Sequence, residues 1–179
     1  MLSTLFRKRL TDEQLATVFV NGVLDVTENG FKEVVELIKY DAAFVTTPHL
    51  DETKDGHFIM IVIVGNLSKL DEVFEADEVG KLEEAIIERF SDAFQMTKVE
   101  FKRYLSEYRS FMSRVNHPSK NMHYAMSKAF FHKYGLNEYQ DEYFKEMVNP
   151  NPLFLKRMDE VMESFFWNWE AFFKRFKIA

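Results

Sequence analysis

Apolar residues recur at spacings of three and four along most of the chain, which is the spacing of an amphipathic helix. The first such face carries Leu15, Val18, Phe19, Gly22 and Val26, and similar faces follow to the carboxyl-terminal segment. We therefore predict helices over residues 12–26, 30–40, 54–75, 77–94, 98–115, 119–134, 138–147 and 152–177.

Capping residues mark the ends of several of these helices. Thr11 with Gln14, and Thr97 with Glu100, have the spacing of a capping box, in which each side chain binds the backbone amide of the other residue. Asparagine and serine also cap helix starts, and glycine ends helices in a left-handed conformation. The further caps that we predict are Ser119, Gly135, Asn137 with Gln140, and Asn151 with Pro152.

The run from Phe58 to Val64 is uniformly apolar and rich in β-branched residues, so a buried strand would also fit it. Helix is favoured because the spacing of three and four continues to Phe74. In addition, the chain offers no second strand to satisfy the backbone of a lone one. A helix that is apolar on all sides is typical of one surrounded by others. We predict a central apolar helix here, with a strand as the alternative.

The composition agrees with a helical protein. Of 179 residues, 46% are hydrophobic and 29% are charged, and there are only 6 glycines and 4 prolines. So few turn-forming residues argue against a sandwich or barrel of many short strands. The irregular stretch 41–55 is either a joint or an ordinary long loop. We predict one all-α domain over residues 1–179, a bundle of seven to eight helices with a central apolar helix and a long aromatic carboxyl-terminal helix.

Several functional classes lack their defining residues. The chain has no cysteine, which excludes disulfides, thiol nucleophiles and cysteine-ligated zinc. Its five histidines have no metal-ligand spacing, and there is no phosphate-binding glycine loop and no nucleophile elbow. We therefore predict no catalytic residue, no metal site and no cofactor, and leave open whether the protein is an enzyme.

The same features bear on location. No apolar run approaches the roughly 20 residues that a membrane-spanning helix needs. The basic triplet Arg7–Arg9 follows the first apolar residues, which is the reverse of the order in a secretory signal. We predict a cytoplasmic protein.

Charge is segregated along the chain, although the net charge is only −6. Residues 71–92 hold nine acidic against two basic residues, and residues 97–134 hold eight basic against two acidic ones. The two predicted helices in this region are joined by a tight turn, so we expect them to pack antiparallel with opposite charges side by side. Nucleic-acid binding by the basic segment is the alternative, disfavoured by the acidic chain and the lack of a known motif.

The richest polar cluster lies in and around the turn before the predicted helix 119–134. Helix starts present free amides and the positive end of the helix dipole, and basic side chains beside them complete a typical anion site. A helix that is merely capped has similar residues, and a histidine on its apolar face also fits a hydrogen-bonded core residue. The candidate anion-binding residues are Arg114, His117, Ser119, Lys120 and His123.

The strongest pattern in the chain is the alternation of three and four from Leu155 to Phe176. An aromatic stripe of this length closes the core of a monomer, pairs with a second copy, or lines an apolar pocket. Trp167 projects from the polar side of this predicted helix, where only the segment 2–6 or a partner would cover it. The candidate interface residues are Trp167, Phe165, Trp169, Phe172 and Phe176.

Together these patterns predict a protein that acts by binding rather than by catalysis. We expect a homo-oligomer formed through the aromatic carboxyl-terminal helix, or a complex with another protein. The first alternative is an enzyme or sensor that binds a phosphorylated or otherwise anionic small molecule at residues 114–120. The second is nucleic-acid binding through residues 97–134.

Overall fold

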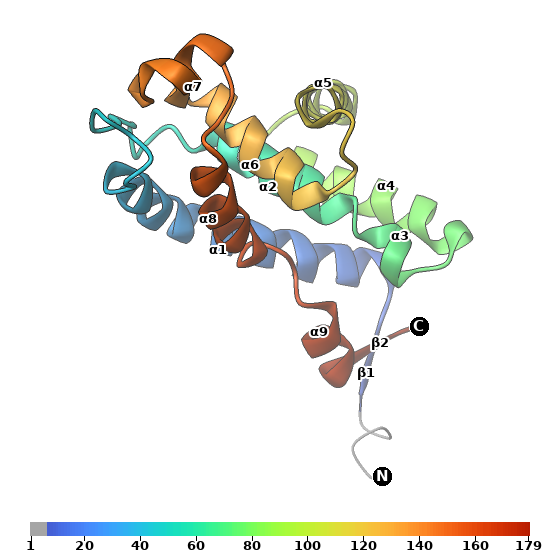
Figure 1. Cartoon of the computed structure of the whole chain (residues 1–179). Helices are drawn as coiled ribbons and strands as arrows, with labels where there is room; N and C mark the ends of the chain where they lie inside the picture. The colour runs from blue at the N-terminus through green and yellow to red at the C-terminus, as the bar shows by residue number, and fades with distance from the viewer. Residues whose placement is uncertain (1–6) are drawn as a thin grey trace.

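The structure, a computed structural model, describes residues 7–179. It confirms an all-α fold (Figure 1). The helices are α1 (Asp12–Lys39), α2 (Gly56–Leu67), α3 (Leu70–Val73), α4 (Ala76–Ala93), α5 (Lys98–Asn116), α6 (Met122–Lys133), the 3-10 helix η1 (Leu136–Tyr139), α7 (Glu142–Met147), α8 (Pro152–Glu163) and α9 (Trp169–Arg175). The strands are β1 (Lys8–Leu10) and β2 (Phe176–Ile178).

Helix α2 is the centre of the bundle. It contacts α1, α5 and α6, and residues 61–67 are all buried. The apolar run from Phe58 to Val64 is therefore helical and central, as predicted, and the strand alternative is wrong. The predicted helix 54–75 is interrupted, because the chain leaves α2 after Leu67. The Ser68 hydroxyl there donates to the Gly65 carbonyl oxygen at 2.7 Å, before the short helix α3 begins.

Helix α1 is continuous, so the predicted division into helices 12–26 and 30–40 is wrong. Thr27 is buried at this point, and its hydroxyl donates to the Val23 carbonyl oxygen of the preceding turn at 2.6 Å. Gly30 remains helical and makes room for a ring from the other end of the chain. A Cβ on Gly30 would lie 2.6 Å from Cε1 of Phe165.

Most of the predicted helix ends are confirmed. Both capping boxes form, and in each of them a threonine hydroxyl accepts an amide proton while the partner side chain reaches back. Gly135 adopts the predicted left-handed conformation, with φ of 65°. The caps that the structure confirms are Thr11 with Gln14, Thr97 with Glu100, Gly135, and Asn151 with Pro152.

Two predicted helix starts are wrong. Helix α6 begins three residues after Ser119, because Asn121 accepts the Tyr124 amide proton at 3.2 Å and is the cap. Asn137 with Gln140 does not start a helix over 138–147. That region divides into η1 and α7, and Asp141 caps α7.

Helices α4 and α5 pack with their opposite charges paired, as the sequence predicts. Glu83 accepts from Arg109 at 2.7 Å, while Glu84 lies 3.1 Å from the ammonium group of Lys98 and 2.5 Å from that of Lys102. These contacts account for three of the eight basic residues in the segment 97–134. They are exposed, so each stabilises the fold by at most about 1 kcal/mol.

The carboxyl-terminal segment is not one helix, and the predicted helix 152–177 is wrong. The chain leaves α8 after Glu163 and starts α9 at Trp169. Asn66 of α2, which is buried, holds this break: its amide nitrogen donates to the Phe165 carbonyl oxygen at 2.9 Å, and its oxygen accepts the Trp167 amide proton at 2.7 Å. Asn168 then caps α9 by accepting the Ala171 amide proton at 2.9 Å.

A small parallel sheet, in which β2 pairs with β1, is not predicted by the sequence. Lys8 is opposite Phe176 and Leu10 is opposite Ile178. Figure 1 shows that α9 and both strands lie together at one end of the molecule, next to the amino-terminal end of α1. None of the helices in residues 7–179 is both long and apolar enough to cross a membrane.

Candidate functional site

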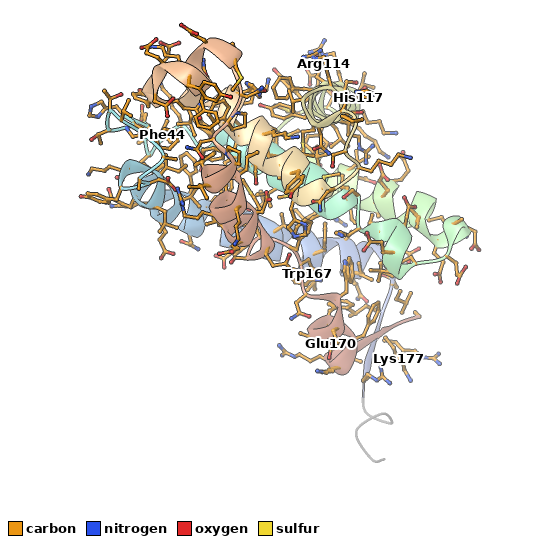
Figure 2. The ribbon with its side chains drawn as sticks, in the orientation of Figure 1. Phe44, Arg114, His117, Trp167, Glu170 and Lys177 are labelled. Carbon is orange, nitrogen blue, oxygen red and sulfur yellow. The ribbon has the colours of Figure 1, made fainter. Side chains whose placement is uncertain are left out.

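The predicted anion-binding residues divide between two places. Arg114 and His117 are exposed at the end of α5 (Figure 2). They line an open, shallow depression there, together with Arg109 and two serines. The Arg109 guanidinium is engaged by Glu83, and that of Arg114 lies over the Phe111 ring at 5.4 Å. The depression is therefore basic, but it has no enclosing wall.

The other three predicted residues do not line this depression. The Ser119 hydroxyl accepts the Asn121 amide proton at 3.1 Å, and Lys120 is exposed. His123 lies at a different surface, where its Nε2 meets the Glu163 carboxylate of α8 and its ring lies 4.9 Å from that of Phe166. The structure thus separates His123 from the residues with which it was grouped.

The predicted interface residues pack largely within their own chain. Phe165, Trp169 and Phe172 are buried, and Phe176 is half-buried. Trp167 does not project into solvent as expected: it is half-buried, and its ring occupies the space that a side chain on Gly22 would need. The segment 2–6, considered above as a cover for Trp167, lies outside the described residues.

A better-walled site lies on another part of the molecule. A pocket of about 760 Å³ is bounded by the first turn of α2, the turn between α4 and α5, helix α5 and the end of α6. We call it the α2–α5–α6 pocket. Its lining residues are His49, Leu50, Asp51, Lys54, Gly56, His57, Ile59, Met60, Phe94, Met96, Phe101, Tyr104, Tyr108, Lys133 and Tyr134.

Aromatic and methionine side chains form most of the wall of this pocket. Phe94 and Phe101 stack with their ring centroids 5.8 Å apart, which fixes one side. Met60, Met96 and Tyr104 complete the apolar wall. Methionine adapts its shape to what lies against it, so this wall suits an apolar guest of varied outline.

The polar groups of the pocket are arranged around two tyrosines. His57 Nδ1 lies 2.5 Å from the Tyr108 hydroxyl. The Tyr134 hydroxyl donates to the Lys54 carbonyl oxygen at 2.8 Å and accepts the Phe58 amide proton at 3.1 Å. The Tyr134 hydroxyl thus both donates and accepts a hydrogen bond, and it anchors the loop before α2 to the end of α6.

Burial shifts the ionisation of these groups toward their uncharged forms. Partial burial, and then the nearby Lys133 charge, lower the pKa of His57. Burial, followed by the charge of Glu107, raises the pKa of Tyr108. Burial also raises the pKa of Tyr134. At neutral pH the pocket therefore presents a neutral imidazole and neutral phenols beside the charged ammonium of Lys133.

Sequence reasoning did not find this pocket. The helical spacing of Phe101, Tyr104 and Tyr108 places them on one face of α5, and they do share a face, but this spacing does not predict an open pocket beside them. One feature of the sequence could have indicated the pocket. Phe94 and Met96 are large apolar residues in the tight turn before α5, where few neighbouring residues can cover them.

No set of three or more histidine, aspartate or glutamate side chains within residues 7–179 is placed to hold a metal ion. Comparisons of the chain with protein-family models, with curated proteins and with solved structures found no match.

Proposed function

We propose that this protein acts by binding, not by catalysis, and that it holds a small, largely apolar molecule in the α2–α5–α6 pocket. The observation that carries the proposal is the pocket itself. Its volume of about 760 Å³ lies within the range of about 300–1,000 Å³ that is typical of small-molecule sites. A cytoplasmic location is part of this proposal, supported by the absence of cysteine.

The chemistry of the wall supports an apolar guest. The Phe94 ring and the side chains of Met60 and Met96 are at least partly exposed, and they would lose contact with water when a guest enters. Burying apolar surface is the main source of affinity for such sites, at about 25 cal/mol per Å². The few polar groups of the pocket would then orient the guest.

The test uses a neutral, apolar fluorescent probe, N-phenylnaphthylamine, which brightens when it leaves water. Gly56 lines the pocket, and a Cβ there would meet no atom within 4 Å. The substitution Gly56→Phe therefore begins a side chain in open space and places a ring at the pocket wall. We expect saturable binding to the natural protein and at least about tenfold weaker binding to Gly56→Phe, a loss of about 1.4 kcal/mol.

The matched control is Gly80→Phe in α4. A Cβ on Gly80 also meets no atom within 4 Å, but Gly80 does not line the pocket. Gly80→Phe should bind the probe as the natural protein does. Absence of saturable probe binding, or equal weakening by both substitutions, would show that the pocket is not a binding site.

The other predictions from the sequence remain predictions. Homo-oligomer formation through Phe165, Trp167, Trp169, Phe172 and Phe176 would have to use the parts of these side chains that stay exposed. Nucleic-acid binding through 97–134 would have to use the basic residues that the acidic residues of α4 leave unpaired. Phe165, Trp167, Phe172 and Phe176 do line a pocket, but its volume is about 360 Å³, half that of the α2–α5–α6 pocket.

A further inference from the structure

Lys133 places a positive charge at the pocket without a matching negative one. Its ammonium lies 4.4 Å from the centre of the Phe111 ring and 4.8 Å from that of Tyr108. No carboxylate of residues 7–179 lies within 4.0 Å of it, whereas Lys98 and Lys102 both share Glu84. Aromatic rings attract a cation, but they supply no counter-charge.

His57 adds a second hydrogen-bond donor. We assign the Tyr108 hydroxyl as the donor of its hydrogen bond with His57, because His57 Nδ1 is its one acceptor among residues 7–179. A neutral imidazole that accepts at Nδ1 carries its proton on Nε2. The Nε2 proton has no acceptor within the described part of the chain, so two residues of the pocket lining, His57 and Lys133, carry donors without a partner there.

The acidic side chain that lines the pocket is already engaged. Asp51 accepts from the Thr53 hydroxyl at 2.6 Å and from its amide at 2.9 Å, and it lies 3.9 Å from the Lys54 ammonium. These hydrogen bonds lower the pKa of Asp51, so it is ionised and paired at neutral pH. Asp51 therefore balances Lys54, and the charge of Lys133 remains.

We propose that the ligand of the α2–α5–α6 pocket is an amphipathic carboxylate, whose charged group binds Lys133 and His57 while its apolar body lies against Phe94 and Met96. This inference rests on the proposed function and names the class of its ligand. A carboxylate offers only acceptors, so it complements two donors. A cationic ligand would be repelled by Lys133, and a neutral one would leave that charge unpaired.

A carboxylate fits better than a phosphate monoester. The pocket supplies one full positive charge, which one carboxylate neutralises. A phosphate monoester carries close to two negative charges at neutral pH. In the pocket, the second negative charge of the phosphate would lose hydration beside the apolar wall without gaining a positively charged partner, which is unfavourable.

The experiment compares four compounds that share one naphthalene ring: naphthylacetate, naphthylethanol, naphthylethylamine and naphthylmethyl phosphate. Each is titrated against the natural protein by calorimetry and by displacement of N-phenylnaphthylamine. We expect the carboxylate to bind about tenfold more tightly than the alcohol, because charge-assisted hydrogen bonds are the stronger kind. The amine and the phosphate should bind more weakly than the carboxylate.

Lys133→Met tests the role of the charge, because methionine keeps most of the apolar stem and removes the ammonium. We expect Lys133→Met to bind the carboxylate no better than the alcohol and to bind the alcohol as the natural protein does. The control is Lys128→Met on the same helix. Its ammonium also lies over a ring, that of Tyr124 at 5.7 Å, but it does not line the pocket. Lys128→Met should keep the tenfold preference.

The outcomes separate this inference from the proposed function. If the neutral probe binds but the four compounds bind equally, or the amine or phosphate binds best, the ligand class is wrong and the binding site stands. If neither the probe nor any compound binds, both fail. Should Lys133→Met not fold, Lys133→Gln takes its place, and the ranking of the compounds on the natural protein still decides.

Discussion

Two aromatic regions of this molecule use their rings in different ways. The terminal cluster, formed by Phe19, Phe74, Trp169, Phe172 and Phe173, is filled by its own side chains. In it, Trp169 stacks on Phe19 at 5.5 Å and meets Phe74 edge-on at 4.9 Å. The α2–α5–α6 pocket is also walled by rings, yet about 760 Å³ between them stays open.

The terminal cluster is filled and the pocket is open because different numbers of elements pack against the rings in the two regions. In the terminal cluster, α1, the residues after α3 and α9 converge on Trp169 and leave only 9% of it exposed. At the pocket, Tyr104 of α5 remains 41% exposed. Aromatic content alone therefore does not distinguish core from site. We expect substitutions in the first region to change stability and those in the second to change binding.

The largest effect should come from Trp169→Ala. This substitution removes the ring on which the terminal cluster packs, and large-to-small changes of this kind cost about 3–5 kcal/mol. Tyr104→Ala, at the pocket wall, should cost about 1 kcal/mol or less because its ring is partly exposed. Urea unfolding of both variants measures the two costs. Similar costs at the two positions would remove the distinction between the regions.

A smaller effect is expected from Gly22→Ala. A Cβ on Gly22 would overlap the ring of Trp167, so either the ring or the helix must shift, at a cost of about 1–3 kcal/mol. Gly80→Ala is the control, since a Cβ there meets no atom within 4 Å. Within a helix that change should stabilise by about 0.5–1 kcal/mol. The two substitutions should thus shift the melting temperature in opposite directions, and shifts of the same sign would contradict the close approach of Trp167.

The sequence was informative where structure depends on neighbouring residues. The two capping boxes, the left-handed Gly135 and the helical character of the run from Phe58 to Val64 are all local. The central place of α2 also followed, because a helix that is apolar on every side has to be covered on every side.

The break after α8 shows where this reasoning stops. Periodicity from Leu155 to Phe176 identifies side chains that face the interior, and Phe165, Trp169 and Phe172 are indeed buried. It does not show whether the backbone between them stays helical. Here the decisive hydrogen bonds come from Asn66, about 100 residues earlier in the chain. Asn168 was a local capping signal for α9, but the continuous stripe concealed it.

The α2–α5–α6 pocket could not be predicted from the sequence for a related reason. The spacing of apolar residues on α5 places Tyr104 and Tyr108 on the apolar face of the helix. It does not show whether another element covers that face or leaves a pocket beside it. None of the residues selected from the sequence as candidate site residues lines this pocket. His57 and Lys133, which carry the proposed charge recognition, are single polar residues whose proximity depends on how α2 and α6 pack.

The smallest expected effect is a dependence of folding stability on pH. It comes from His57, which lines the pocket, and from His132; neither of them belongs to the terminal cluster. Burial lowers the pKa of both His57 and His132, with further lowering by Lys133 for His57 and by Lys128 for His132. Below the ordinary histidine pKa of 6.5, the unfolded chain therefore binds more protons than the folded one. Each histidine thus contributes a loss of stability as the pH falls through 6.5 toward its folded-state pKa.

Titration of the histidine ring protons by NMR measures this effect directly. Lys133→Met should raise the pKa of His57 and leave that of His132 in place, and Lys128→Met should do the reverse, because each cation acts mainly on its own neighbour. In both variants the pKa should stay below 6.5, since burial is the larger cause and is retained. If Lys133→Met left the pKa of His57 unchanged, Lys133 would not lie beside His57, and the carboxylate site would lose its cation.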